Sequence, residues 1–151
     1  MLADDHALSR EGLRDLLELN GFSVCAEASD AEGAVEAAVR ERPDACLLDV
    51  NMPGGGIAAA AAISGRVRET AIVMFTVSSD RRDILAALDA GATGYVLKGT
   101  DPDYLVAVLR QALAGELAVP AALAGRLRAP NGMTTRCRGA MGECEARTQG
   151  A

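Results

Sequence analysis

Ala45-Cys46-Leu47-Leu48-Asp49 is an apolar run that ends in a carboxylate. A continuous apolar run is typical of a strand buried on both faces, as in a parallel sheet. A carboxylate at the end of such a strand is costly unless it caps a helix, coordinates a metal or reacts. Capping is disfavoured here because Pro53 and Gly54-Gly55-Gly56 separate Asp49 from the next helical pattern. The run therefore predicts a buried strand that presents a functional acid.

Apolar runs and helical patterns alternate on both sides of this strand, which we expect to cover residues 45–50. Further strands are predicted at residues 23–28, 71–76 and 94–97. The clearest amphipathic helix follows Asp101-Pro102, a typical cap and first turn, with its apolar residues at i, i+3 and i+4 spacing. This alternation predicts an α/β fold, a doubly wound parallel sheet with helices on both faces.

Length and composition limit the classes of protein that the chain can form. With 151 residues, half of them apolar, it has room for one well-packed domain. The acidic start and the lack of a long apolar stretch argue against a secretory signal and a membrane span, so we expect a cytoplasmic protein. Residues 1–125 hold 19 acidic and 10 basic side chains, which disfavours binding of nucleic acid by this part.

Polar side chains close the predicted strands. In an open α/β sheet, ligands bind beyond the carboxyl ends of the strands. Asp4 and Asp5 follow a short apolar start, and Asp49 and Thr76 follow later strands. Three converging carboxylates repel one another unless a hard cation is bound, and Mg²⁺ prefers such oxygen ligands. Taken alone, the Asp4-Asp5 pair is more commonly a solvated acidic turn that caps the next helix.

Lys98 follows the last predicted strand and is the only lysine among fifteen basic residues. Lysine offers a compact point charge on a flexible stem, whereas arginine offers a wide planar fork. The single use of lysine at a strand end indicates a site that needs the point charge. A chance surface position is the competing interpretation.

Four segments occur in the order and spacing of a known family. They are Leu2-Ala3-Asp4-Asp5-His6, Leu47-Leu48-Asp49-Val50-Asn51-Met52-Pro53, Phe75-Thr76-Val77-Ser78 and Gly91-Ala92-Thr93-Gly94-Tyr95-Val96-Leu97-Lys98. With these segments, residues 2–127 resemble the receiver domain of two-component response regulators, and most closely the branch that usually precedes a LuxR/NarL-type helix-turn-helix. The resemblance implies a flavodoxin-like sheet of five parallel strands in the order 2-1-3-4-5.

The resemblance also implies a function. Asp49 would accept a phosphoryl group from a histidine kinase in a reaction that needs Mg²⁺, and the signal would pass, in this family, usually to transcription regulation. Asp5 would bind the metal directly and Asp4 through water, with Asp49 and the backbone carbonyl of Asn51 as further ligands. The catalysis would be limited to the domain's own phosphorylation and dephosphorylation.

Three more residues receive roles by resemblance. Lys98 would neutralise one phosphoryl oxygen and Thr76 would donate a hydrogen bond to another. Tyr95 would change its rotamer when Thr76 moves inward. Phosphoryl transfer depends mostly on positioning and charge neutralisation, which a divalent cation, a lysine and a hydroxyl supply.

The sequence departs from the family pattern at three places. Only three residues precede the acidic pair, so the first strand should be short and the sheet less stable. The loop at residues 53–57 looks one residue short. After a receiver at residues 1–117, we expect a linker or short helix at 118–127 and a disordered tail at 128–151, with no helix-turn-helix periodicity. We therefore expect no DNA binding from this chain itself, while a homodimer through the receiver is compatible with the resemblance.

Two other functions remain open at this stage. One is a degenerate receiver that acts only as a protein-interaction module, which is disfavoured because every active-site position is filled. The other is a small flavodoxin-like nucleotide-binding enzyme. Its only support is Gly54-Gly55-Gly56, and the chain lacks both G-x-G-x-x-G and a phosphate-binding Lys-Ser/Thr loop.

Overall fold

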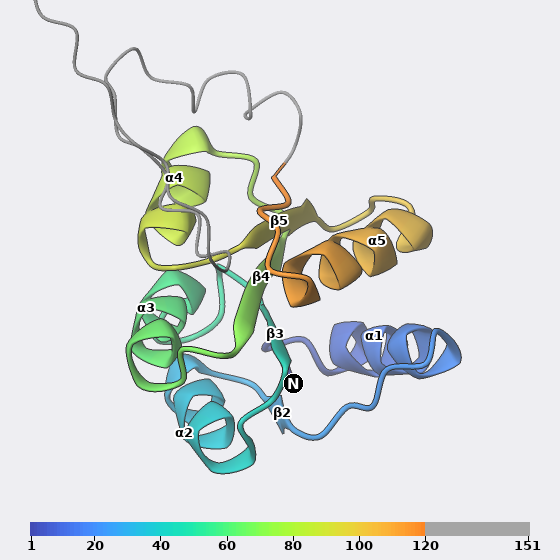
Figure 1. Cartoon of the computed structure of the whole chain (residues 1–151), viewed down its shortest axis with the longest axis horizontal. Coiled ribbons are helices and arrows are strands. Elements are labelled where there is room, and N and C mark those ends of the chain that lie inside the picture. Colours follow the sequence, from blue (N-terminus) through green and yellow to red (C-terminus); the bar gives the residue numbers. More distant parts are fainter. Residues whose placement is uncertain (120–151) are drawn as a thin grey trace, which may run out of the picture.

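A computed structural model describes residues 1–119 of the chain, in which strands and helices alternate (Figure 1). The strands are β1 Leu2–Ala3, β2 Glu27–Ala28, β3 Ala45–Leu48, β4 Ala71–Thr76 and β5 Gly94–Leu97. The helices are α1 Ala7–Leu19, α2 Ala31–Glu41, α3 Gly56–Arg66, α4 Arg81–Asp89 and α5 Pro102–Leu113.

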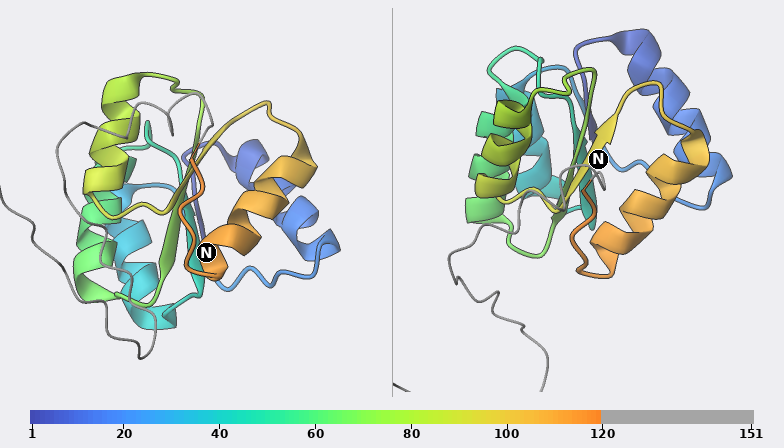
Figure 2. Two further views of the ribbon diagram at one scale, coloured as in Figure 1. Left: turned by 45° about the horizontal axis from the view of Figure 1, so that its top comes forward. Right: turned by 90° about the horizontal axis from the view of Figure 1, so that it is seen from above.

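The five strands form one parallel sheet in the order β2-β1-β3-β4-β5. Helices α2, α3 and α4 cover one face of this sheet, and α1 and α5 cover the other (Figure 2). The predicted doubly wound, flavodoxin-like fold with strand order 2-1-3-4-5 is therefore confirmed.

Each face of the sheet has its own apolar core. Small side chains such as Ala34, Ala60 and Ala87 bring α2, α3 and α4 close to one face, where Ile63 and Ile72 fill the space between them. The opposite core is built mainly from Leu and Val side chains of α1, α5 and the central strands. Close packing of this kind holds the strand ends in fixed positions, which is what a site at the sheet edge requires.

The helix boundaries follow the predicted signals. The Asp101 carboxylate accepts a hydrogen bond from the Asp103 amide, and Pro102 begins α5. Asp30 and Asp80 cap α2 and α4 in the same way. Gly21, in the left-handed region with φ 86°, follows the end of α1.

One strand is much shorter than predicted. Of residues 23–28, only Glu27–Ala28 pairs as β2. The register pairs Leu2 with Glu27 and Ala3 with Ala28, so residues 23–25 lie beyond the paired part of β1. In the part of the chain that the structure describes, Val24 and Cys25 form no backbone hydrogen bond. A cavity of about 400 Å³ opens beside them, which agrees with the expectation of a short first strand.

The chain turns back onto the sheet after α5. Ala118 pairs with Gly94, and its amide and carbonyl bond to the backbone of Thr93 and Tyr95 at 2.8 and 3.1 Å. The predicted linker or helix at 118–127 lies outside the described residues except for Ala118 and Val119, and the predicted tail at 128–151 lies wholly outside them. Within residues 1–119, every helix is too short or too polar to cross a membrane.

Candidate functional site

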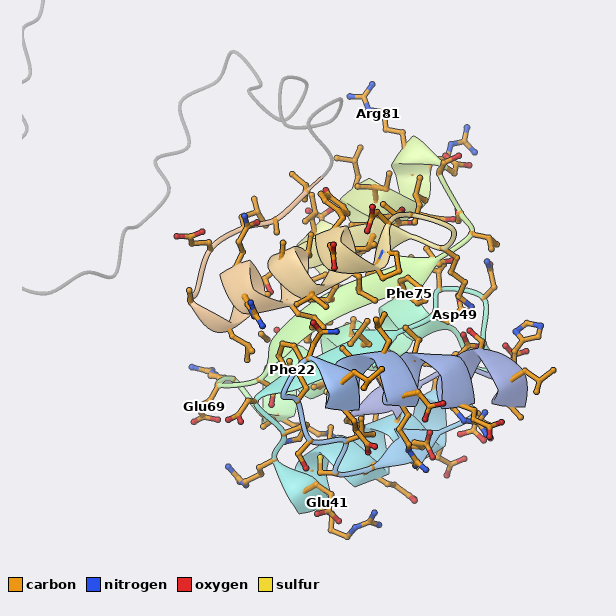
Figure 3. The ribbon with its side chains drawn as sticks, turned by 90° about the vertical axis from the view of Figure 1, so that its right-hand side faces the viewer. Phe22, Glu41, Asp49, Glu69, Phe75 and Arg81 are labelled. Atoms are coloured by element: carbon orange, nitrogen blue, oxygen red, sulfur yellow. The ribbon has the colours of Figure 1, made fainter. Side chains whose placement is uncertain are left out.

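The predicted site residues meet at the carboxyl edge of the sheet. Asp4 and Asp49 follow neighbouring strands whose ends are in register, Ala3 opposite Leu48. Thr76 ends β4 and Lys98 follows β5, and the Lys98 amide donates to the Thr76 carbonyl at 2.8 Å. Figure 3 shows Asp49 and Phe75 at one end of the domain, with Glu41 and Glu69 at the other.

Lys98 joins the two buried carboxylates. Its Nζ lies 2.5 Å from Asp4 Oδ2 and 3.0 Å from Asp49 Oδ2. Both acids are nearly inaccessible, with exposed fractions of 2% and 4%. The ammonium also lies 5.9 Å from the centre of the Phe75 ring. The only lysine of the sequence is thus the counter-charge of the pocket, and the chance surface position is ruled out.

The charges of Asp4 and Lys98 stabilise each other. Burial alone would raise the pKa of Asp4, but hydrogen bonds from Lys98, the His6 amide and Ser9 outweigh it and lower the pKa below its ordinary value. Burial alone would lower the pKa of Lys98, but the hydrogen bonds to Asp4 and Asp49 outweigh it and raise that pKa. Both groups are therefore charged at neutral pH.

Three further residues hold Asp4, and sequence reasoning did not assign them to the site. Ser9 donates its hydroxyl to Asp4 Oδ2 at 3.0 Å, and the His6 amide donates to Oδ1 at 2.8 Å. Arg10 Nη1 donates to the Asp4 carbonyl at 2.5 Å. The sequence did contain a signal for these residues, namely polar and basic side chains about one helical turn after Asp4-Asp5. Such side chains can reach the acidic pair because the first turn of α1 passes over it.

A group of potential ligands faces the same point. Atoms of Asp4, Asp5, His6 and Asp49 all lie within 4.8 Å of one another. His6 lies in the loop before α1, and its Nδ1 lies 3.0 Å from Asp5 Oδ1. Three carboxylates face a single lysine, an excess of negative charge on oxygen ligands that suits Mg²⁺. The backbone carbonyl of Asn51 stays a predicted ligand. The Asn51 amide bonds to Asp49 Oδ1 at 3.2 Å.

Thr76 and Tyr95 lie behind the pocket, and both are fully buried. Thr76 Oγ1 accepts hydrogen bonds from the Ser78 amide at 3.3 Å and from Asn51 Nδ2 at 3.5 Å. The Tyr95 hydroxyl donates to the Ser78 carbonyl at 2.8 Å. Burial raises the pKa of Tyr95 to about 12, so its hydroxyl remains a neutral donor at physiological pH.

The three glycines after Asp49 shape the loop beside the pocket. Gly54 and Gly55 adopt φ values of 84° and 85°, which other residues rarely adopt. Gly56 begins α3 in contact with the Asp49 backbone, so that a Cβ at Gly56 would lie 1.9 Å from the Asp49 carbonyl oxygen. These conformational needs account for the glycine run.

Gly56→Ala should therefore displace Asp49. Because the clash is with backbone atoms, we expect a loss of about 3 kcal/mol or more in the free energy of unfolding, measured by denaturant titration. Gly65→Ala in the same helix is the matched control, since a Cβ there has nothing within 4 Å. This control should be slightly stabilising because alanine favours helix. Equal stability of the two variants would contradict the close approach.

The fold and the site together define a doubly wound α/β domain with an acidic, lysine-paired pocket at its carboxyl edge. Residues 1–110 match the family model described as "Response regulator receiver domain". The chain belongs to this family.

Individual relatives agree with this assignment. The chain is 42% identical over 117 residues to the nitrate/nitrite response regulator protein NarP of Escherichia coli K12, covering 76% of this chain and 54% of that protein. It is 38% identical over 124 residues to the NarL protein of the same organism, covering 81% and 57%. The chain thus spans little more than half the length of these relatives.

Solved structures show the same likeness. A LuxR-family two-component response regulator from Aurantimonas sp. SI85-9A1 is 39% identical, with a TM-score of 0.78 and coverage of 83% of this chain and 91% of that one. The signal receiver domain of the putative response regulator NarL from Mycobacterium tuberculosis is 32% identical, with a TM-score of 0.73 and coverage of 76% and 94%. The predicted resemblance to the LuxR/NarL-type branch is confirmed.

Proposed function

We propose that this chain accepts a phosphoryl group on Asp49 from a histidine kinase, in a reaction that depends on Mg²⁺. The observation that carries the proposal is the contact of Lys98 with two buried carboxylates at the sheet edge. A structural role alone would not need two acids and a lysine withdrawn from water, because such burial is costly.

The chemistry requires little of the protein beyond positioning. An Asp49 oxygen forms a bond to phosphorus while the phosphorus–nitrogen bond of a phosphohistidine breaks, and the imidazole keeps the electron pair. Lys98 neutralises charge on the transferred oxygens, and the Thr76 hydroxyl donates to one of them. Asp4, Asp5 and Asp49 would hold Mg²⁺, which supplies further neutralisation when bound. Two observations support this assignment: the chain belongs to the receiver family, and the carboxylates of Asp4, Asp5 and Asp49 converge within 4.8 Å of one another.

The proposal is tested with a small acyl phosphate as phosphodonor. The chain should gain one phosphoryl group, seen by intact-mass spectrometry, in the presence of Mg²⁺ and not after chelation. A chain that gains none with Mg²⁺ present would support the degenerate-receiver alternative.

Asp5 should dominate metal affinity. It is the more exposed member of the acidic pair, and Asp4 is already paired with Lys98. We expect Asp5→Ala to weaken Mg²⁺ binding by about tenfold or more in a calorimetric titration, since a charged ligand is lost. Asp15→Ala, an exposed acid of α1, is the matched control and should bind as the wild type does. Equal affinities of the two variants would contradict the assignment of Asp5.

The output of the phosphorylated domain is also proposed. We expect a cytoplasmic signalling domain that acts through protein contacts, with dimerisation as one route, and that does not itself bind DNA. The excess of acidic side chains in residues 1–125 supports this expectation, because it repels phosphate backbones. NarP and NarL are named as nitrate/nitrite response regulators.

A further inference from the structure

Arg10 lies near the start of α1, and its side chain reaches back to the acidic pair. Its Nη1 donates to the Asp4 backbone carbonyl at 2.5 Å, the one hydrogen bond that its side chain forms within residues 1–119. The Arg10 Nε is buried without a partner there, and no carboxylate of the described residues pairs with the guanidinium. A surface arginine keeps its charged head in water, so this withdrawn guanidinium needs another explanation.

The carbonyl that Arg10 binds belongs to the peptide that joins Asp4 to Asp5. The Asp4 amide donates to the Ala28 carbonyl at 3.1 Å, so the next rung of the parallel ladder would run from the Asp30 amide to the Asp4 carbonyl. That bond does not form in the described part of the chain, because the backbone turns into α2 at Asp30. Arg10 Nη1 takes the place of the missing strand partner.

The end of the ladder allows both acids to face the pocket. Consecutive residues of a regular strand point to opposite faces of the sheet, whereas atoms of Asp4 and Asp5 lie within 4.8 Å of each other and of Asp49. The peptide between the two acids must therefore leave the strand conformation, and its carbonyl needs a donor outside the sheet. Arg10 supplies that donor.

We propose that Arg10 is a positioning residue for the Mg²⁺ site, which holds the Asp4–Asp5 peptide turned out of the sheet so that both carboxylates meet the cation. This inference rests on the proposed function of the pocket. Arg10 acts through the backbone of Asp4, and its guanidinium contacts neither carboxylate.

The sign of the effect on metal affinity separates positioning from charge. Arg10 is a cation near a site for a cation, so by charge alone its removal should strengthen Mg²⁺ binding. Positioning predicts the opposite, because loss of a group that orients a metal ligand weakens metal binding by roughly 10–100-fold. Arg10→Met keeps an unbranched apolar stem, and we expect it to bind Mg²⁺ about tenfold more weakly in a calorimetric titration.

Three further variants make this comparison specific. Arg14→Met is the matched control, because Arg14 lies one turn further along α1 and pairs with Glu27 at the surface; it should bind Mg²⁺ as the wild type does. Arg10→Lys keeps a donor on a flexible stem and should recover most of the affinity. Arg10→Gln, whose side chain is too short to reach the Asp4 carbonyl, should bind as weakly as Arg10→Met and replaces it if that variant does not fold. Unchanged or tighter binding after loss of the arginine, or an equal loss in Arg14→Met, would overturn the proposal.

Amide hydrogen exchange measured by NMR tests the same link in the presence of a chelator. The His6 amide donates to Asp4 Oδ1 at 2.8 Å, and this bond depends on the position of the Asp4–Asp5 peptide. Exchange of the His6 amide should be roughly tenfold faster in Arg10→Met than in the wild type, since the turn opens more readily without its donor. Arg14→Met should exchange as the wild type does. Equal rates in all three proteins would show that Arg10 does not hold the turn.

Phosphorylation by an acyl phosphate gives the final comparison. The Mg²⁺ concentration for half-maximal phosphorylation should rise about tenfold in Arg10→Met, while the rate at saturating Mg²⁺ stays near that of the wild type, because the proposed role of Arg10 does not involve the phosphoryl group. A reduced rate at saturation with an unchanged Mg²⁺ requirement would contradict positioning. If the wild type neither binds Mg²⁺ nor gains a phosphoryl group, the proposed function fails, and the exchange of the His6 amide still decides whether Arg10 holds the turn.

Discussion

Asp49→Asn is expected to reduce phosphorylation of the chain by a factor of at least about 10³, because a neutral amide oxygen is a poor nucleophile. The wild type incubated with an acyl phosphate and Mg²⁺ should show one added phosphoryl group by intact-mass spectrometry. The variant should show none over the same time. This is the largest effect that the site predicts, since the substitution removes the proposed phosphoacceptor itself.

The variant should remain folded, so that its loss of phosphorylation is informative. Lys98 also contacts Asp4 at 2.5 Å, and we expect this contact to remain when the charge of Asp49 is removed. The removal also relieves repulsion between Asp49 and the two neighbouring acids. Asp15→Asn, on the exposed face of α1, should be phosphorylated as the wild type is. Labelling of the Asn variant at the wild-type level would rule out Asp49 as the acceptor.

The sequence was sufficient to predict the layers and the sheet because both depend on repeated local signals. The apolar runs at residues 71–76 and 94–97 became β4 and β5. Strand order could be assigned only through the family resemblance, since periodicity does not say which strands are neighbours. The predicted length of β2 was wrong because a strand pairs only where its neighbour β1 lies beside it. The extent of β1 is a tertiary property, and the apolar run at residues 23–28 carries no information about it.

The convergence of the main pocket residues was also predictable, because parallel strands bring their carboxyl ends to one edge. Lys98 could be singled out because lysine occurs once. The role of Ser9 could not be predicted in this way. Serine is common at helix starts, and only the packing of α1 against the sheet decides whether its hydroxyl reaches Asp4. The glycine run shows the same limit, since its close approach to Asp49 is visible only in three dimensions.

Lys98→Ala should destabilise the metal-free protein by about 3 kcal/mol, because it leaves two buried carboxylates without their counter-charge. Denaturant titration in the presence of a chelator measures this loss. Added Mg²⁺ should recover much of it, since the cation replaces the missing charge, and the variant should bind Mg²⁺ as tightly as the wild type or more tightly. Phosphorylation should nevertheless be impaired, because Lys98 no longer neutralises a phosphoryl oxygen. Arg68→Ala, which removes an exposed basic side chain, is the control.

The dependence of this stability difference on pH follows from the two shifted groups. The pKa of Asp4 is lowered on folding, so its contribution is present above pH 3.8 and is lost as the pH falls through the folded value. The pKa of Lys98 is raised, so its contribution is present below pH 10.5 and is lost as the pH rises through the folded value. The difference between wild type and Lys98→Ala should therefore shrink in strong acid and in strong alkali. In acid the decline should begin above pH 3.8, because burial raises the pKa of Asp4 in the variant once Lys98 no longer bonds to it. A difference that is unchanged in strong acid would mean that Lys98 stabilises the fold through its apolar stem and not through its charge.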